Sequence, residues 1–311
     1  MLPDEHVPVM PEEVIQALAI KPGEYYIDCT FGRGGHSRLI LKHLTNTGRL
    51  LAMDRDERAL NSKAAVALGQ DPRFVLEKNN LMRLESMVSK LGWSTKVAGI
   101  LMDLGLSSPQ LDDAVRGFSF MKDGPLDMRM DTGHGMTAAD WLAEVSEPKL
   151  AEVLKVYGEE RFARRIARAI VSARSLAPIT TTLELSKLIE SALPARDPNK
   201  HPATRSFQAI RIFINRELEE LQAGLEQALR VLKPGGRLVV ISFHSLEDRI
   251  VKRFIRKEQQ GGDFPAALPV HAYEFQPRLR AIGPPIRPEA SEIAANPRAR
   301  SAILRVAERV T

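Results

Sequence analysis

The chain has 311 residues, of which 44% are hydrophobic and 27% are charged, and its formal net charge is +5. This length allows one large domain or two modest ones, and the composition excludes disorder as the main state. The apolar runs are much shorter than the roughly 20 residues of a membrane span, and the segment MLPDEH lacks the features of a secretion signal. The single cysteine, Cys29, excludes an internal disulfide. We therefore expect a cytoplasmic protein without membrane contact.

Strand-like and helix-like segments alternate in the first third of the chain. The apolar pattern predicts strands over residues 25–30, 49–54, 74–76 and 97–104 and a helix over 37–44. Several of these strands are near-continuous runs of Val, Ile and Leu, which is typical of a parallel sheet covered by helices on both faces. The sequence thus predicts an α/β fold.

This alternation stops in the middle of the chain. Residues 105–135 are irregular, residues 137–232 have helical periodicity, and strand signals return only at 236–243 and 302–307. We therefore predict one α/β domain into which a helical domain is inserted. The predicted bounds are 1–107 plus 216–311 for the α/β domain and 108–215 for the insertion.

The segment IDCTFGRGGH at 27–36 follows a predicted strand and opens a predicted helix, where glycines let backbone amides approach a ligand closely. A dinucleotide fingerprint starting at Gly32 would need a third glycine where Ser37 stands, and no P-loop string occurs. The acidic-x-G-x-G-x-G turn of the S-adenosylmethionine methyltransferases matches better. It begins at Asp28 and has Thr30 in place of its first glycine.

Asp54 ends the second predicted strand, where a carboxylate can accept both hydroxyls of a ribose. A tight structural turn followed by a surface aspartate is the alternative. Cys29 lies inside the turn, and we interpret it as a small apolar residue and not as a nucleophile.

Eight separated strings resemble one family over nearly the whole chain: HVPVM at 6–10, DCTFGRGGHS at 28–37, MDLGLSSPQLDD at 102–113, GFSFMKDGPLDMRMD at 117–131, YGEERFARRIARAI at 157–170, HPATRSFQAIRI at 201–212, SFHSLEDRIVKRF at 242–254 and NPRARSAILRVAER at 296–309. They are similar to the bacterial ribosomal RNA small subunit methyltransferase H family. Where this chain has Met102, the family often has leucine, which is a conservative difference.

The resemblance implies a class I, Rossmann-like methyltransferase domain with an inserted all-helical domain. It implies S-adenosyl-L-methionine as cofactor and methylation of the exocyclic N4 amine of a cytidine in the decoding region of 16S ribosomal RNA. The implied partner is 16S rRNA within the small ribosomal subunit, and no metal is required.

The resemblance also implies which residues contact the cofactor. They lie in the glycine turn, at the ends of strands and in the segment that follows the fourth strand: Gly34, Gly35, His36, Asp54, Leu81, Asp103 and Gln110. Leu81 stands where the family has a phenylalanine, so an apolar wall for adenine is kept while aromatic stacking is lost.

The amine of cytosine is a poor nucleophile, so methyl transfer needs hydrogen-bond acceptors beside its protons. Ser107 and Ser108 partly match the loop that holds the target amine in amino-methyltransferases. Asp127 and Asp131 lie four residues apart, which on a helix would place both carboxylates on one face. We hypothesise that one of them accepts from the amine, the alternative being an ion pair with Arg129 or Arg116. Phe118 or Phe120 is a candidate for stacking on the base, each equally a candidate for the core.

Three segments of the chain carry polar or basic side chains that are candidates for contacts with RNA. Helical periodicity over 158–174 separates an apolar face from a face of four arginines, a second helix from about residue 204 groups three polar side chains, and residues 249–257 hold five basic residues without an acidic one. We predict RNA contacts from Arg161, Arg164, Arg165, Arg168, Gln208, Arg211, Asn215, Lys252, Arg253 and Arg256.

Three other functions are weighed against this one. The cofactor motif does not distinguish RNA cytidine from another nucleobase or from DNA, and a non-catalytic ribosome-assembly factor that binds RNA would have similar basic surfaces. An NAD oxidoreductase is disfavoured because Ser37 replaces the third glycine of the dinucleotide fingerprint.

Overall fold

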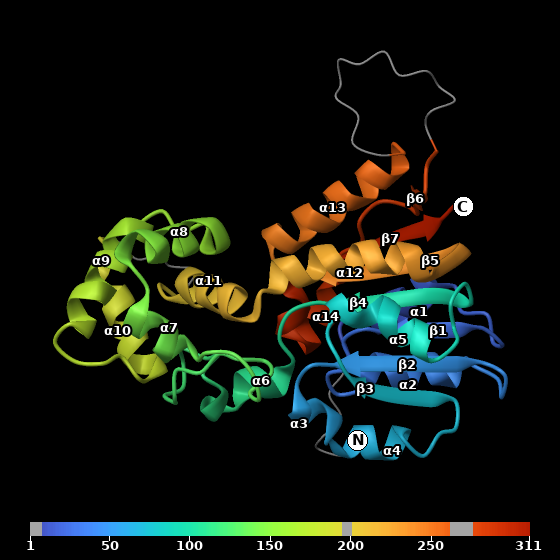
Figure 1. The fold of residues 1–311 in the computed structure, drawn as a ribbon, viewed down its shortest axis with the longest axis horizontal. Helices are drawn as coiled ribbons and strands as arrows, with labels where there is room; N and C mark the ends of the chain where they lie inside the picture. The colour runs from blue at the N-terminus through green and yellow to red at the C-terminus, as the bar shows by residue number, and fades with distance from the viewer. Residues whose placement is uncertain (1–7, 195–200, 262–275) are drawn as a thin grey trace, which may run out of the picture. The chain divides into compact units, whose positions relative to one another are not determined.

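The computed structural model describes residues 8–194, 201–261 and 276–311 (Figure 1). The chain divides into two compact units, one formed by Met1–Gly105 with Leu218–Thr311 and the other by Leu106–Glu217. The predicted boundaries, after residues 107 and 215, lie close to these. The first unit is built on a sheet, and the second consists of helices and loops.

The first unit contains a seven-stranded sheet with the strand order β3-β2-β1-β4-β5-β7-β6. The first five strands in this order pair in parallel, whereas β7 is antiparallel to both β5 and β6. This arrangement confirms the expected class I methyltransferase fold. The strands are β1 (Tyr25–Asp28), β2 (Arg49–Asp54), β3 (Phe74–Lys78), β4 (Val97–Asp103), β5 (Leu232–Ser242), β6 (Leu279–Ala281) and β7 (Ile303–Arg309).

Helices cover both faces of this sheet, because successive side chains of the buried strands alternate between two apolar clusters. Helices α5, α12 and α13 pack on one face, and α1 and α2 pack on the other. The helices of this unit are α1 (Pro11–Leu18), α2 (Gly35–Lys42), α3 (Glu57–Leu60), α4 (Lys63–Leu68), α5 (Leu84–Lys90), α12 (Glu217–Val231), α13 (Ser245–Gln259) and α14 (Ala290–Ala295), with 3₁₀ turns at Leu81–Arg83 and Pro297–Ser301.

The direction in which successive strands are added to the sheet changes between β1 and β4. Strand order reverses there because β2 and β3 extend the sheet on one side of β1, and β4 and β5 extend it on the other. The carboxyl ends of parallel strands that flank such a reversal form a crevice for ligands. Asp28, Asp54 and Asp103 end β1, β2 and β4 and therefore lie along this edge.

The second unit is helical, as predicted, around its own apolar cluster. Its helices are α6 (Ser108–Asp112), α7 (Ala138–Glu144), α8 (Glu147–Gly158), α9 (Ala163–Arg174), α10 (Thr182–Ala192) and α11 (Thr204–Asn215), with a 3₁₀ turn at Ala114–Arg116. The helical periodicity predicted for residues 137–232 does not mark the break after residue 215, where Arg216 has a left-handed φ of 51° between α11 and α12. Among the described residues, no helix is both long and apolar enough to cross a lipid bilayer.

Candidate active site

The glycine turn between β1 and α2 is closely built. Gly34 has a φ of 71°, and a Cβ there would lie 2.9 Å from the ring of Phe31 and 3.0 Å from Leu68. A Cβ on Gly35 would lie 3.0 Å from the ring of Pro8. Gly34 is therefore favoured by both its left-handed backbone conformation and its small size, and a side chain at position 35 would press on Pro8. The turn brings backbone amides to the carboxyl edge of the sheet, as the cofactor motif predicts.

The side chain of Asp28, at the end of β1, is hydrogen-bonded to residues of this turn and of α2. Its carboxylate accepts hydrogen bonds from the Ser37 hydroxyl at 2.7 Å and from the backbone N–H of Thr30 at 3.1 Å. The Thr30 hydroxyl oxygen in turn accepts from the backbone N–H of Asp103 at 2.7 Å. Ser37, which replaces the third glycine of the dinucleotide fingerprint, thus ties the turn to the end of β1, and Thr30, which replaces the first glycine of the methyltransferase motif, ties it to the end of β4. The sequence offered no signal for this role, because the bonds join separate strands.

Asp54 stands at the end of β2 as predicted for a ribose acceptor. Its two carboxylate oxygens accept from the backbone N–H groups of Asp56 and Gly32, each at 2.8 Å. Burial raises the pKa of Asp54 to about 6, although these two amide bonds lower it. Each oxygen keeps a lone pair for a ribose hydroxyl.

His36 and Asp103 face each other across the same edge. The Nε2 atom of His36 lies 3.5 Å from Oδ2 of Asp103. Within the described part of the chain, neither ring nitrogen of His36 has a hydrogen-bond partner, and neither does Oδ1 of Asp103, although all three atoms are buried. Burial lowers the pKa of His36, but the carboxylates of Asp103, Asp28 and Glu292 raise it by more, so that it lies above its usual value.

Buried polar atoms are rarely left without partners, so these atoms indicate a polar ligand at this edge. The amino-acid portion of S-adenosylmethionine carries a carboxylate and an ammonium group. An imidazolium suits the former and an aspartate the latter. The donors and acceptors of this site therefore fit the cofactor implied by the sequence.

Two buried residues, Leu81 and Cys29, belong to the same apolar cluster. Leu81 lies in the core against α12, where a Cβ on Gly224 would come within 2.7 Å of the Leu81 Cβ. Its contact with adenine stays a prediction. Cys29 is buried and burial raises the pKa of its thiol well above the usual value. This environment suits the apolar role that we expected and not a nucleophile.

Ser107, Ser108 and Gln110 belong to the second unit, at the start of α6. Ser107 is the N-cap residue, and the Gln110 side-chain oxygen accepts from the Ser107 backbone N–H at 2.9 Å. Gln110 is buried, so its side chain shapes this short helix. The cofactor contact of Gln110 and the substrate contacts of the two serines stay predictions.

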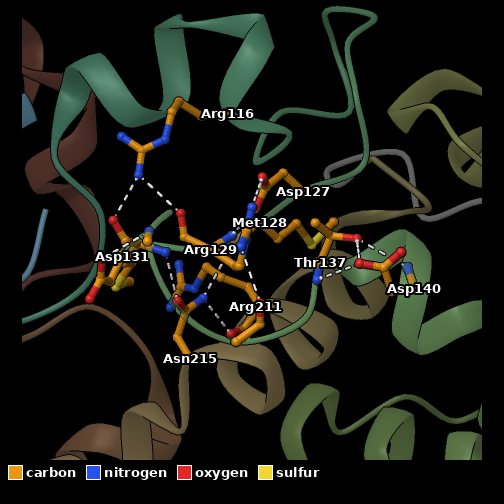
Figure 2. Close-up of polar contacts among 12 residues, drawn as sticks. Arg116, Asp127, Met128, Arg129, Asp131, Thr137, Asp140, Arg211 and Asn215 are labelled. Carbon is orange, nitrogen blue, oxygen red and sulfur yellow. Dashed lines mark hydrogen bonds and ion pairs between the residues drawn. The ribbon is translucent and has the colours of Figure 1, made fainter. Parts of the chain in front are cut away.

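Asp127 and Asp131 do not share a helix face, because residues 125–131 form an irregular loop. The helical interpretation of their spacing was wrong, and the alternative, an ion pair, holds for Asp127. The Nε and Nη2 atoms of Arg129 donate to its two oxygens at 2.8 Å each (Figure 2). Burial raises the pKa of Asp127, but Arg129 lowers it by more. Asp131 accepts from the Gly133 backbone N–H and lies 3.0 Å from Nδ1 of the exposed His134.

This loop is held by two buried side chains. Asn215 donates to the carbonyl of Met128 and accepts from the N–H of Met130, both at 2.7 Å, and Arg116 donates to the carbonyls of Arg129 and Met130 at 3.0 Å (Figure 2). Met128 is fully buried with a left-handed φ of 61°. Asn215, predicted to contact RNA, is therefore engaged inside the protein, and its burial does not favour a contact with RNA.

The other candidates for RNA contacts differ in exposure. Arg161, Arg164, Arg165 and Arg168 are exposed, but Arg161 precedes the first residue of α9 and is not on its helical face. Arg168 also lies 3.6 Å from Glu147, an acidic neighbour that the pattern within residues 158–174 did not reveal. On α13, Lys252, Arg253 and Arg256 are all exposed.

The two remaining candidates lie on α11 and contact other parts of the second unit. Gln208 donates to the carbonyl of Tyr157 at 3.3 Å, and Arg211 makes two bonds of 2.8 Å to Glu217. Of the two candidates for base stacking, Phe118 is buried in the core, and Phe120 stacks on the ring of His201 with centroids 4.5 Å apart.

Comparison with known proteins gives the family. Residues 4–310 match the model of the MraW methylase family. Proteins named ribosomal RNA small subunit methyltransferase H from Thiobacillus denitrificans and Methylococcus capsulatus are each 56% identical to this chain, over 98% and 96% of it and 97% and 99% of their own lengths. A protein of the same name from Nitrosococcus oceani is 55% identical over 98% of this chain and 97% of its own. This confirms the resemblance of the sequence motifs, and the chain belongs to the MraW methylase family.

Proposed function

We propose that this chain transfers a methyl group from S-adenosylmethionine to the exocyclic N4 amine of a cytidine in the decoding region of 16S ribosomal RNA, within the small ribosomal subunit. The buried Oδ1 of Asp103 and the buried ring nitrogens of His36, which lack hydrogen-bond partners among the described residues, carry the cofactor half of the proposal. The family match and the names of the relatives support the methylase activity and the ribosomal RNA.

When bound, S-adenosylmethionine supplies an electrophilic methyl group on its sulfonium. Displacement at that carbon needs correct positioning more than acid or base strength. In this proposal, Asp54 accepts the ribose hydroxyls, and His36 and Asp103 hold the amino-acid portion. Thr30 keeps Asp103 in place through its bond to the Asp103 backbone. The amine must reach a buried methyl group, so the target nucleotide is splayed out of its stack.

The target amine needs an acceptor as its lone pair becomes available. Asp127 accepts two bonds from Arg129. The contacts of Asp131 include the Gly133 backbone N–H and the exposed His134, and an ion pair with an exposed partner is weak enough for a substrate amine to displace. We therefore assign the acceptor role to Asp131, with Ser107 and Ser108 holding the base.

Single-turnover methylation at saturating RNA tests this assignment. We expect Asp131→Asn to slow the reaction by about tenfold or more while cofactor affinity stays unchanged, because the acceptor that it removes acts on the target amine in the transition state. Asp127→Asn is the matched comparison and should act through loop stability. Rates near wild type for both variants would remove both carboxylates from the chemistry.

The exposed stripe of Lys252, Arg253 and Arg256 on α13 is our candidate for phosphate contacts from the first unit. The three acidic residues of this helix bond to groups outside the stripe, and Glu247 accepts from the backbone N–H of Phe243 at 2.8 Å. Asp248 makes two bonds to Arg305, at 2.7 and 3.0 Å, and Glu258 bonds to Arg278 at 2.6 Å. The apolar side of α13 lies in the core through Val251 and Ile255, so the helix does not offer an amphipathic face to a membrane. The arginines of α9 supply a similar surface on the second unit.

The substrate is tested most directly in the organism that carries the gene. Mass spectrometry of 16S rRNA nucleosides from a deletion strain should show the loss of N4-methylcytidine. The wild-type gene should restore it and an Asp103→Ala gene should not. Loss of a different methylated nucleoside would show another target base. Unchanged methylation together with defective subunit assembly would favour a non-catalytic RNA-binding factor.

A further inference from the structure

A hydrogen bond joins the N-terminal segment to α14, near the other end of the chain. The backbone N–H of Met10 donates to Oε1 of Glu292 at 2.7 Å, across 282 residues of sequence. Met10 is fully buried and has a left-handed φ of 52°. Such a conformation in a non-glycine residue persists only where the surroundings enforce it, and the Glu292 carboxylate is one of the contacts that do so.

The same segment lies against the glycine turn. Pro8 contacts Gly35, since a Cβ on this glycine would be 3.0 Å from the proline ring. Val9 and Met10 belong to the apolar cluster that also contains Phe31 of the turn and Ile40 of α2. Residues 8–10 therefore form one wall of the turn that precedes α2, and Glu292 is hydrogen-bonded to that wall through the Met10 backbone.

Glu292 also contributes charge to this region. The carboxylates that face His36 are Asp103 at the end of β4, Asp28 at the end of β1 and Glu292 on α14. Burial lowers the pKa of the His36 imidazole, but these three groups together raise it above its usual value. One side chain on α14 thus acts on both the wall and the histidine of the site.

We propose that Glu292 is a positioning residue of the cofactor site, which holds residues 8–10 against the glycine turn and so retains bound S-adenosylmethionine. This inference rests on the proposed function, because it takes the turn to be the place where the cofactor binds. Neither the cofactor motifs nor the residues carried over from the family include Glu292. Its role is visible only in the structure, because the hydrogen bond joins residues that are far apart in the sequence.

Two substitutions separate the tether from the charge. Glu292→Gln keeps an oxygen that can accept the Met10 N–H but removes the negative charge, whereas Glu292→Ala removes both. Glu289→Ala is the matched control. Glu289 is the N-cap residue of α14, three positions before Glu292, and its exposed side chain makes no capping hydrogen bond to the helix. The measurements are hydrogen exchange of the Met10 region, the dissociation rate of S-adenosylmethionine, and the NMR titration of His36 in the full-length protein.

We expect Glu292→Ala to speed both exchange near Met10 and cofactor dissociation by about ten- to a hundredfold, the range for losing a hydrogen bond to a charged group. Glu292→Gln should have a smaller effect on both rates, while its His36 titration moves to lower pH as far as that of Glu292→Ala. Rates in Glu292→Ala equal to those of Glu289→Ala would overturn the proposal. Faster exchange with unchanged dissociation would also overturn it, because the tether would then not serve the cofactor.

The proposed function has a separate outcome in the same experiment. If the wild-type protein binds no S-adenosylmethionine in calorimetry, the cofactor assignment itself fails and the inference about Glu292 falls with it. If the wild type binds and the Glu292 variants release the cofactor no faster than the control, only the inference about Glu292 fails.

Discussion

A single added Cβ atom would affect the glycine turn at position 34. At Gly34 two separate effects disfavour a side chain, the left-handed φ of 71° and the contact with Phe31 and Leu68. Gly92 has a similar φ of 67°, but apart from its chain neighbours no residue has an atom within 4 Å of the position that its Cβ would take. The two glycines therefore allow conformational strain and steric overlap to be measured apart.

We predict that Gly34→Ala destabilises the protein more than Gly92→Ala. Left-handed backbone costs an alanine roughly 1–2 kcal/mol at either site, and overlap with Phe31 adds to this at Gly34 alone. Denaturant unfolding of both variants gives the difference, and calorimetry should show weakened cofactor binding for Gly34→Ala only. Equal unfolding free energies would mean that the turn relaxes without cost.

The carboxyl group of Asp54 predicts how cofactor binding depends on pH. Its pKa is raised to about 6, and only its ionised form can accept from both ribose hydroxyls. Binding therefore favours loss of the proton, so affinity should rise as the pH increases through 6 and then level off. One pH unit below that pKa we expect about tenfold weaker binding. Calorimetry across this range tests the prediction, and Asp54→Asn should bind weakly without this rise.

Residue patterns predicted the cofactor edge better than the target loop. The aspartates at 28, 54 and 103 follow buried apolar runs, and parallel strands necessarily bring such ends together. The spacing of Asp127 and Asp131, in contrast, fits a helix and an irregular loop equally well. Two sets of hydrogen bonds decide between them, from Arg129 to Asp127 and from Asn215 to the loop backbone. The spacing of the two aspartates contains no information about either partner.

Among the elements, α13 shows how a helix separates its charges. Two of its acidic side chains, Asp248 and Glu258, bond to β7 and to the segment before β6, while Lys252, Arg253 and Arg256 are exposed. The position of Asp248 would otherwise allow an ion pair with Lys252 four residues later. Its bonds to Arg305 instead leave the outer stripe cationic.

We predict that replacing Lys252, Arg253 and Arg256 together by glutamine weakens RNA binding and flattens its dependence on salt. Each lost phosphate contact should reduce the log-log slope by about 0.7 to 0.9, hence by about 2 to 3 in total. The control replaces Lys90, Arg230 and Arg280, which are exposed and ion-paired, and removes the same net charge. Filter binding of 16S rRNA fragments at several salt concentrations compares the two. A common slope would show that the stripe touches no phosphate.

Element boundaries were predictable where burial is continuous and failed where it is interrupted. Strand β2 has the predicted bounds, since its interior is wholly buried. Strand β6 was missed because it is short and two of its three residues are exposed. Helix α9 begins at Ala163 and not near residue 158, because Glu159 adopts a left-handed conformation that ends α8 first.

At the scale of the whole molecule, all cofactor candidates except Gln110 belong to the first unit. We predict that S-adenosylmethionine at a hundred times its dissociation constant stabilises the protein by about 2.7 kcal/mol. Hydrogen exchange should place the added protection in the glycine turn and at the ends of β2 and β4. Added protection in α6 would support the assignment of Gln110, and unchanged exchange in the first unit would contradict the proposed site.

The place of β7 in the sheet has a consequence for synthesis. Strand β7 pairs on one side with β5 and on the other with β6, and it is the last of the seven strands in the chain. While a ribosome is still making residues 243–302, the edge of β5 has no partner strand and is open to pairing with other chains. The sheet can therefore be completed only after β7 has been synthesised. We expect chaperones to retain stalled chains that end before β7.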